Sequence, residues 1–274
     1  MRNDSFIVAT HLRRFIFYIV AGLMSLAINA HASTIHLLQA NLYSWFTMDK
    51  RKATPPIVGM TTYINAHDFD FITTQENDYL LTDSEYKLNK NYKLAGQRED
   101  ASIFYDSSRW IMVENTWKKI AISSDGGGSR VAVFAQFQNM ENGNMLTVGT
   151  SHFCVAWGGH SDCKGGQMVA HQQDTKSIAE FLEQYSPNSP TLVTGDFNNL
   201  DDNLKQTQLI ESIFGNYGLN AVKKEGNFIG PTFGSSIIDF VYFRRLQHQE
   251  PSLYTSAKGN PSDHAAIDVT FTTI

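Results

Sequence analysis

Apolar, strand-like runs of this chain repeatedly end at polar side chains, and this pattern constrains the fold most. Residues 191–194 lead into Gly195-Asp196-Phe197-Asn198, and residues 237–241 carry Asp239 inside an otherwise apolar run. An unpaired carboxylate inside such a run destabilises a protein by several kcal/mol. The same pattern recurs at Asn41, Glu76, His152 and Asp263-His264. We therefore expect several strand ends to converge on one polar site.

Residues 1–32 have the features of a secretory signal. Arg2, Arg13 and Arg14 precede an apolar stretch at 15–28, and Ala30-His31-Ala32 provides the small residues that signal peptidase requires. The alternative, a membrane anchor, needs about 20 apolar residues. We expect cleavage before Ser33, a secreted or periplasmic protein, and no stable membrane insertion.

Residues 33–274 are sufficient for one large α/β domain with a full core. No repeat, low-complexity tract or linker divides them. The formal net charge of the sequence is −5 at pH 7, and the leader holds more basic than acidic residues. The acidic remainder disfavours unspecific binding to nucleic acid, although bound divalent cations can reverse the sign locally.

The sequence has two cysteines, Cys154 and Cys163. In an oxidising compartment a pair this close predicts a disulfide that closes a small loop. The alternatives are two buried free thiols and a zinc site with His152, His160 or His171. The glycine-rich segment 157–166 is either a substrate-selecting loop over the site or a plain connector.

Hydrophobic patterns predict strands at 35–41, 69–74, 101–105, 110–117, 130–137, 145–152, 191–194, 237–243 and 265–271. They predict helices at 55–66, 172–185 and 204–214. Many strands with few amphipathic helices favour an α/β fold: a four-layer α/β sandwich of two packed mixed β-sheets flanked by helices.

The polar strand ends, taken as one site, supply carboxylates, amides and imidazoles. Oxygen donors suit a hard cation such as Mg²⁺, Mn²⁺ or Ca²⁺. A metal that neutralises phosphoryl charge, a carboxylate that orients water and a histidine that moves a proton suffice for hydrolysis of a phosphate ester. The structural alternatives are a turn at Asn41, capping by Glu76, Asp196 and Asn198, and a core histidine at His152.

Six ordered motifs resemble those of the endonuclease/exonuclease/phosphatase superfamily: Asn41, Gln75-Glu76, His152, Gly195-Asp196-Phe197-Asn198, Ile238-Asp239-Phe240 and Ser262-Asp263-His264. That superfamily includes pancreatic-type deoxyribonuclease, abasic-site endonucleases, the B subunit of cytolethal distending toxin, neutral sphingomyelinases and inositol polyphosphate 5-phosphatases. The motifs extend over nearly all of residues 33–274. The resemblance implies a metal site, for Mg²⁺ or else Mn²⁺ or Ca²⁺, formed by Asn41, Glu76 and Asp263.

The resemblance also implies the catalytic residues. Asp196 would orient or activate the attacking water, and Asn198 would hold that water or a phosphate oxygen. His264, fixed by Asp239, and His152 would face the phosphate. The chain departs from many members in having Ser236-Ile237-Ile238 before Asp239, with no arginine or lysine there.

Other features bear on the substrate. Aromatic residues at 42–46 and Lys50-Arg51-Lys52 follow Asn41. They suit stacking on bases, contact with a lipid interface, or a plain core with a solvated charge run. Arg130, at the start of a predicted strand, is expected to form a surface ion pair, and the alternative is a contact with a phosphate.

We expect a secreted, divalent-metal-dependent phosphodiesterase that hydrolyses nucleic acid, with DNA as the first choice of substrate. The alternatives are a phosphoinositide phosphatase or sphingomyelinase-type phospholipase C, whose partner would be a phospholipid or phosphoinositide. A further alternative is a catalytically silent binding module on the same fold.

Overall fold

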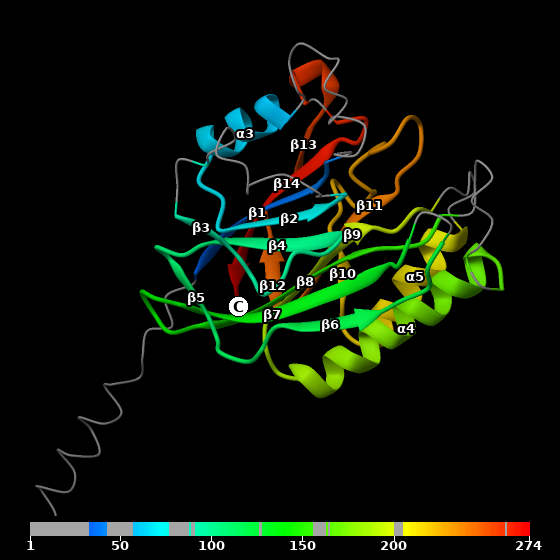
Figure 1. The fold of residues 1–274 in the computed structure, drawn as a ribbon, viewed down its shortest axis with the longest axis horizontal. Helices are drawn as coiled ribbons and strands as arrows, with labels where there is room; N and C mark the ends of the chain where they lie inside the picture. Colours follow the sequence, from blue (N-terminus) through cyan, green and yellow to red (C-terminus); the bar gives the residue numbers. More distant parts are fainter. Residues whose placement is uncertain are drawn as a thin grey trace, which may run out of the picture. The chain divides into compact units, whose positions relative to one another are not determined.

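Two mixed β-sheets, each of seven strands, pack face to face and carry helices on their outer surfaces (Figure 1). The computed structural model describes residues 33–42, 57–76, 88, 91–125, 128–155, 163, 165–199, 205–260 and 262–274. Ser33–Ile274 form one compact unit. The expected leader, residues 1–32, lies outside the described residues.

The first sheet has the strand order β12-β14-β1-β2-β4-β3, and β13 also pairs with β14. Its members are β1 Thr34–Asn41, β2 Phe71–Gln75, β3 Tyr92–Leu94, β4 Ala101–Asp106, β12 Leu246–His248, β13 Ser252–Tyr254 and β14 Ala266–Thr273. At the centre of this sheet, β1 runs parallel to β2 and antiparallel to β14.

The second sheet has the order β10-β11-β9-β8-β7-β5, and β6 also pairs with β7. Its members are β5 Trp110–Met112, β6 Lys118–Ala121, β7 Val131–Asn139, β8 Met145–His152, β9 Thr191–Asp196, β10 Asn220–Ala221 and β11 Asp239–Arg244. Here β8 and β9 are parallel, whereas β11 runs antiparallel to β9.

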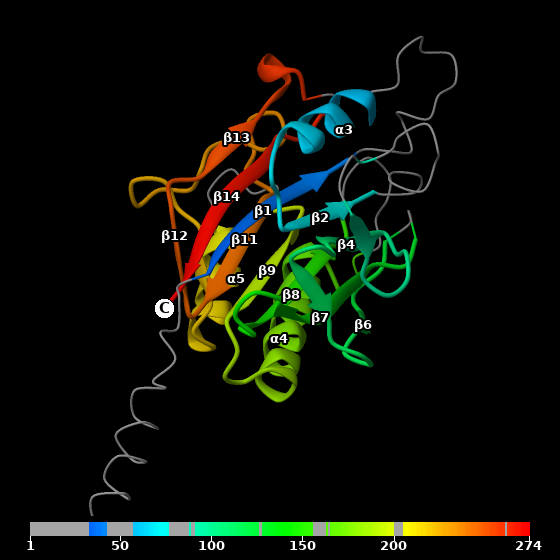
Figure 2. The ribbon, with the colours of Figure 1, turned by 90° about the vertical axis from the view of Figure 1, so that its left-hand side faces the viewer.

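Helices cover the outer face of each sheet (Figures 1 and 2). Helix α3, Ile57–Ala66, packs Met60 and Ile64 against the first sheet. Helices α4, Gln167–Tyr185, and α5, Lys205–Asn216, pack Ile178 and Ile210 against the second sheet. A short 3-10 helix, η1, spans Ser256–Lys258. The expected four-layer α/β sandwich is confirmed. No helix among the described residues is long and apolar enough to cross a bilayer.

The inner face of β1 changes from apolar to polar along the strand. Side chains alternate between the two faces of a strand, and Ile35 and Leu37 belong to the core between the sheets. The next two positions on that face are Gln39 and Asn41, which are 0% and 1% exposed. The core between the sheets is therefore apolar at one end and polar at the other, where the site lies.

One expected strand is divided. Residues 110–117 were expected to form a single strand, but they form β5 and then a turn before β6. The chain turns at Asn115, whose φ is 62°, a left-handed conformation that interrupts a strand. Five short strands, β3, β6, β10, β12 and β13, had no predicted counterpart, because they hold only two to four residues and show no periodicity.

Candidate active site

The expected site residues lie at one end of the two sheets because parallel neighbouring strands end at the same edge. In the first sheet Asn41 at the end of β1 is in register with Gln75, so Glu76 follows beside it. In the second sheet His152 at the end of β8 is in register with Asp196 at the end of β9. Asp196 is also in register with Asp239, the first residue of β11.

A single oxygen of Asp196 lies at the centre of this arrangement. Its Oδ2 accepts a hydrogen bond from Asn41 Nδ2 at 2.9 Å. It lies 3.6 Å from His152 Nε2 and 3.9 Å from His264 Nε2. All four side chains are buried. One carboxylate therefore meets an amide from the first sheet and two imidazoles that approach from different directions.

His264 is oriented by a buried carboxylate. Its Nδ1 lies 2.9 Å from Asp239 Oδ2, and its loop is attached to β1 because Ser262 Oγ donates to the carbonyl oxygen of Asn41 at 2.8 Å. Burial alone would lower the pKa of His264, but Asp239, followed by Asp196 and Asp263, raises this pKa to about 10. The protein without a bound cation therefore holds His264 as an imidazolium at neutral pH.

His152 has a carboxylate partner that the sequence analysis missed. Its Nδ1 lies 2.8 Å from Asp100 Oδ2, just before β4. Arg130 Nη1 lies 2.9 Å from the same oxygen, and Arg130 Nη2 lies 3.0 Å from Asp125 Oδ2. Burial favours a high pKa for Asp100, but His152 and Arg130 together lower it well below its usual range. Asp100 in turn raises the pKa of His152 against the effect of burial.

The interpretation of Arg130 as a surface ion pair was wrong. Its side chain is 13% exposed, and that of Asp125 is fully buried. The expected Arg130 pair therefore forms inside the site, where Arg130 Nη1 lies 2.6 Å from His152 Nδ1 and 3.2 Å from His152 Nε2.

The loop after β9 approaches the loop after β8 closely. A Cβ at Gly195 would lie 2.2 Å from the carbonyl oxygen of Ser151, so this position requires glycine. Asn198 has a φ of 49° and donates from Nδ2 to the carbonyl oxygen of Phe153 at 2.9 Å. Its backbone N–H donates to Asp196 Oδ1 at 2.9 Å. Asn198 therefore fixes the orientation of the Asp196 carboxylate and holds the two loops together.

The residues expected to bind a metal fit a hard cation. Asn41 Nδ2 donates to Glu76 Oε1 at 3.3 Å, and Asp263 Oδ1 lies 4.0 Å from His264 Nε2. Burial raises the pKa of Glu76, of Asp196 and of Asp263. Carboxylates that are gathered at one partly buried site favour a bound cation, and carboxylate and amide oxygens are the ligands that Mg²⁺, Mn²⁺ and Ca²⁺ prefer.

Asp196, Asp239 and His264 provide a second possible ligand set around the same point. Ligand atoms of these three side chains lie within 4.8 Å of one another. Asp239 and His264 already bind each other, and the assignment of a cation to the oxygen donors Asn41, Glu76 and Asp263 stays a prediction.

Comparisons with known proteins agree with this architecture. No family model and no curated protein matches the sequence. The catalytic domain of human Nocturnin with bound sulfate superposes with a TM-score of 0.67 at 15% identity, covering 88% of this chain and 96% of that one. An endonuclease/exonuclease/phosphatase family protein from Bacteroides thetaiotaomicron superposes with a TM-score of 0.62 at 17% identity, covering 89% and 99%.

This chain has the endonuclease/exonuclease/phosphatase fold. A third structure with this fold, D. rerio TDP2 complexed with a single-strand DNA product, has a TM-score of 0.62 at 16% identity and covers 88% of this chain and 100% of its own. At such identities the likeness establishes the fold, and the chemistry has to be argued from the side chains.

Within this endonuclease/exonuclease/phosphatase fold, the structure brings together all eight expected site residues: Asn41, Glu76, His152, Asp196, Asn198, Asp239, Asp263 and His264. It adds Asp100 and Arg130 behind His152, and Gln39 behind Asp239. None of these three belongs to a superfamily motif. Gln39 is two residues before Asn41 on β1, so strand alternation places it on the same face, but only the fold brings it to Asp239.

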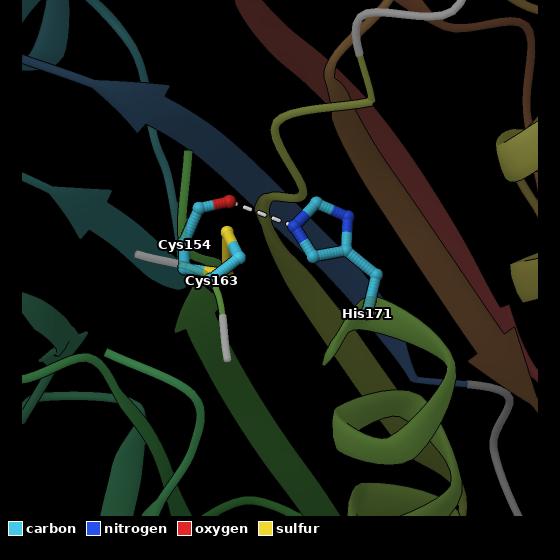
Figure 3. Close-up of side chains that lie close together, drawn as sticks. All are labelled: Cys154, Cys163 and His171. Atoms are coloured by element: carbon cyan, nitrogen blue, oxygen red, sulfur yellow. Dashed lines mark hydrogen bonds between the residues drawn. A yellow bond between two sulfur atoms is a disulfide. The ribbon is translucent and has the colours of Figure 1, made fainter. Parts of the chain in front are cut away.

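The predicted disulfide between Cys154 and Cys163 is present (Figure 3). His171 from α4 lies beside it and donates from Nε2 to the carbonyl oxygen of Cys154 at 2.7 Å. Burial lowers the pKa of His171 to about 4. This neutral histidine therefore holds the chain just after His152. Because the two cysteines form a disulfide, the alternatives of free thiols and of a zinc site do not describe the oxidised protein. Residues 156–162, 43–56 and 200–204 lie outside the described residues, so the possible substrate-selecting loop and the basic triplet stay predictions.

Proposed function

We propose that this chain is an exported, divalent-metal-dependent phosphodiesterase that hydrolyses nucleic acid, with DNA as substrate. One observation carries the proposal. Two imidazoles, each bound to a carboxylate through Nδ1, direct Nε2 toward Asp196 beside a set of oxygen ligands. Metal-assisted attack of water on phosphorus requires these groups.

The residues would divide the chemistry among them. Asn41, Glu76 and Asp263 would hold the cation, which neutralises charge on the phosphoryl oxygens and leaving group when bound. Asp196 would orient the attacking water and accept its proton, because its carboxylate is buried at the point where both histidines face.

The histidines would stabilise the phosphate. With Nδ1 bound to Asp239, His264 presents Nε2 to the substrate and can donate a hydrogen bond or proton from that atom. His152 would donate a second hydrogen bond from the opposite side, and Asn198 would hold Asp196 in place. Two donors and an orienting carboxylate then surround one phosphoryl group.

Two further observations support the choice of substrate and compartment. The D. rerio TDP2 structure, which shares the fold over most of this chain, holds a single-strand DNA product. The leader-like residues 1–32 and the disulfide support export to an oxidising compartment.

The test begins with the full chain expressed with its leader and recovered from the exported fraction. Mass spectrometry gives the first residue, and we expect Ser33. The purified protein should nick supercoiled plasmid with Mg²⁺ or Mn²⁺ and stop with a chelator, whereas His264→Ala should nick it about 10²–10⁴-fold more slowly under the same conditions. RNA, sphingomyelin and phosphoinositides are assayed in parallel. Release of phosphate or phosphocholine from a lipid, without nicking of plasmid, would contradict the nucleic-acid assignment.

A further inference from the structure

Gln39 binds the oxygen of the Asp239 carboxylate that His264 leaves free. Its Nε2 donates to Asp239 Oδ1 at 2.9 Å, while Asp239 Oδ2 binds His264 Nδ1 at 2.9 Å. Gln39 belongs to β1 in one sheet and Asp239 to β11 in the other, so this hydrogen bond crosses the interface between the sheets. Both oxygens of the carboxylate are thereby occupied.

The orientation of the Gln39 amide follows from its partner. An ionised carboxylate only accepts hydrogen bonds, so the NH₂ group must face Asp239. The amide oxygen, Oε1, then points away, and it has no hydrogen-bond partner among the described residues. A buried polar atom without a partner destabilises a protein by about 1–3 kcal/mol.

Packing alone does not explain a glutamine at this position. Ile35 and Leu37 precede it on the same inward face of β1, and all three side chains are fully buried. A leucine or methionine at position 39 would extend that apolar core and bury no amide oxygen. It would also leave Asp239 Oδ1 without its donor, so the hydrogen bond to Asp239 is what accounts for the glutamine.

We propose that Gln39 is a positioning residue, which holds the Asp239 carboxylate in the orientation that directs His264 toward the reacting phosphate. The backbone N–H of Asp239 is fixed as well, because it donates to Thr232 Oγ1 at 3.0 Å. Without Gln39, the carboxylate is free to rotate about its side-chain bond and to leave Nδ1 of His264. This inference rests on the proposed function for its catalytic consequence, but the hydrogen-bonded arrangement itself can be tested without catalysis.

The chain offers a matched control in Gln75. It is a fully buried amide on the neighbouring strand β2, its Nε2 donates to Thr150 Oγ1 at 2.8 Å, and its Oε1 also has no partner among the described residues. Gln75→Leu therefore removes the same kind of group from the same layer without removing a contact to Asp239. Gln75 adjoins Glu76, so its replacement also disturbs the neighbouring site residue. The loss of rate in Gln75→Leu is therefore an upper limit for the loss that follows from replacing a buried amide between the sheets without any specific role in catalysis.

The first readout is the NMR signal of the His264 imidazole in the full-length, metal-free protein, assigned by its loss in His264→Gln. We expect Gln39→Leu to shift the Nδ1–H resonance and to speed its exchange with water, and Gln75→Leu to leave it in place. Gln39→Met, which keeps the length of the side chain, serves if the leucine variant fails to fold. An unchanged Nδ1–H signal in the folded Gln39 variant would overturn the proposal.

The second readout is the rate of plasmid nicking in Mg²⁺. We expect Gln39→Leu to lower kcat about 10- to 100-fold more than Gln75→Leu, with KM changed less than about twofold, because only the orientation of a reacting group is lost. Equal losses of kcat in the two variants would assign Gln39 a merely structural role. If the wild type cleaves no phosphodiester, the proposed function fails, while the NMR comparison still decides whether Gln39 positions the pair.

Discussion

His152 and His264 each bind a carboxylate through Nδ1, at 2.8 Å from Asp100 and 2.9 Å from Asp239, and each directs Nε2 toward Asp196. Behind Asp100 lies the guanidinium of Arg130, which also binds Asp125. Behind Asp239 lies the neutral amide of Gln39. The two halves of the site therefore share the contact between imidazole Nδ1 and a carboxylate, but one carboxylate has a cationic partner and the other a neutral one.

The difference separates two ways of supporting a catalytic pair. Arg130 compensates the charge of Asp100, so His152 belongs to a balanced cluster of charges. Gln39 only orients Asp239, so the negative charges of Asp239 and its neighbours act on His264 and raise its pKa to about 10. We expect Arg130 to contribute mainly to the stability of the folded protein and Gln39 mainly to the reactivity of His264.

The largest effect is expected on catalysis. His264→Ala should lower the rate of plasmid nicking by about 10²–10⁴-fold, because it removes the proton-carrying group. His152→Ala should lower it less, since Arg130 stays behind as a positive charge next to the vacated position. Rates are measured at saturating Mg²⁺, with circular dichroism as a control for folding. Equal losses in the two variants would show that the halves do not differ in function.

The effects on stability should have the reverse order, with a larger loss in the half of the site that holds His152 than in the half that holds His264. Arg130→Met leaves the carboxylates of Asp100 and Asp125 without their cation, and loss of one partner of a buried ion pair destabilises by about 3–5 kcal/mol. Gln39→Leu removes one hydrogen bond from a neutral amide to the Asp239 carboxylate and should change the free energy of unfolding by at most about 1–3 kcal/mol. Urea unfolding of the oxidised protein measures both. A Gln39 variant less stable than the Arg130 variant would contradict the comparison.

Metal affinity should depend more on Glu76 than on Asp263. Glu76→Gln removes a buried carboxylate, and we expect Mg²⁺ affinity to fall roughly 10- to 100-fold. Asp263→Asn should have a smaller effect, since the Asp263 side chain is 37% exposed and water can replace it. Isothermal titration with Mg²⁺ tests both variants without any substrate. Unaltered affinity in Glu76→Gln would exclude that residue from the ligand set.

The smallest effect is a difference in pH dependence. The pKa of His264 is raised from 6.5 to about 10 in the folded protein. Its contribution to stability is therefore fully present below about pH 6.5 and is lost as the pH rises toward about 10. In chelator, the Tm of the wild type should fall more steeply between about pH 7 and 9.5 than that of His264→Gln. If Tm falls equally with pH in the wild type and in His264→Gln, the neighbouring carboxylates do not raise the pKa of His264.

Most of the architecture could be predicted from the sequence because strand periodicity and motif order are local signals. The edges of β8, at Met145 and His152, agree with the prediction, and the motifs anticipated that Asn41 and Asp196 would meet. The catalytic and metal-binding roles of these residues stay predictions until the variants are measured.

The supporting residues could not be predicted from local patterns. Asp100 is one acid in the loop before β4 and follows another acid, Glu99. Arg130 reads as a surface residue until the fold places Asp100 and Asp125 on either side of it. Gln39 gains its meaning only when β1 faces β11 across the interface. Residues that act through another residue are specified by packing over long sequence distances, which a motif does not record.

The position of β1 has a consequence for biosynthesis. This strand is in register with β14, where Thr34 faces Thr272 and Gln39 faces Ile267. Asn41 and His264 therefore meet only after β14 has left the ribosome, because pairing over such a sequence separation cannot form on a shorter nascent chain. Until β14 has been synthesised and pairs with β1, the nascent polypeptide holds no assembled site, however much of the chain has already folded.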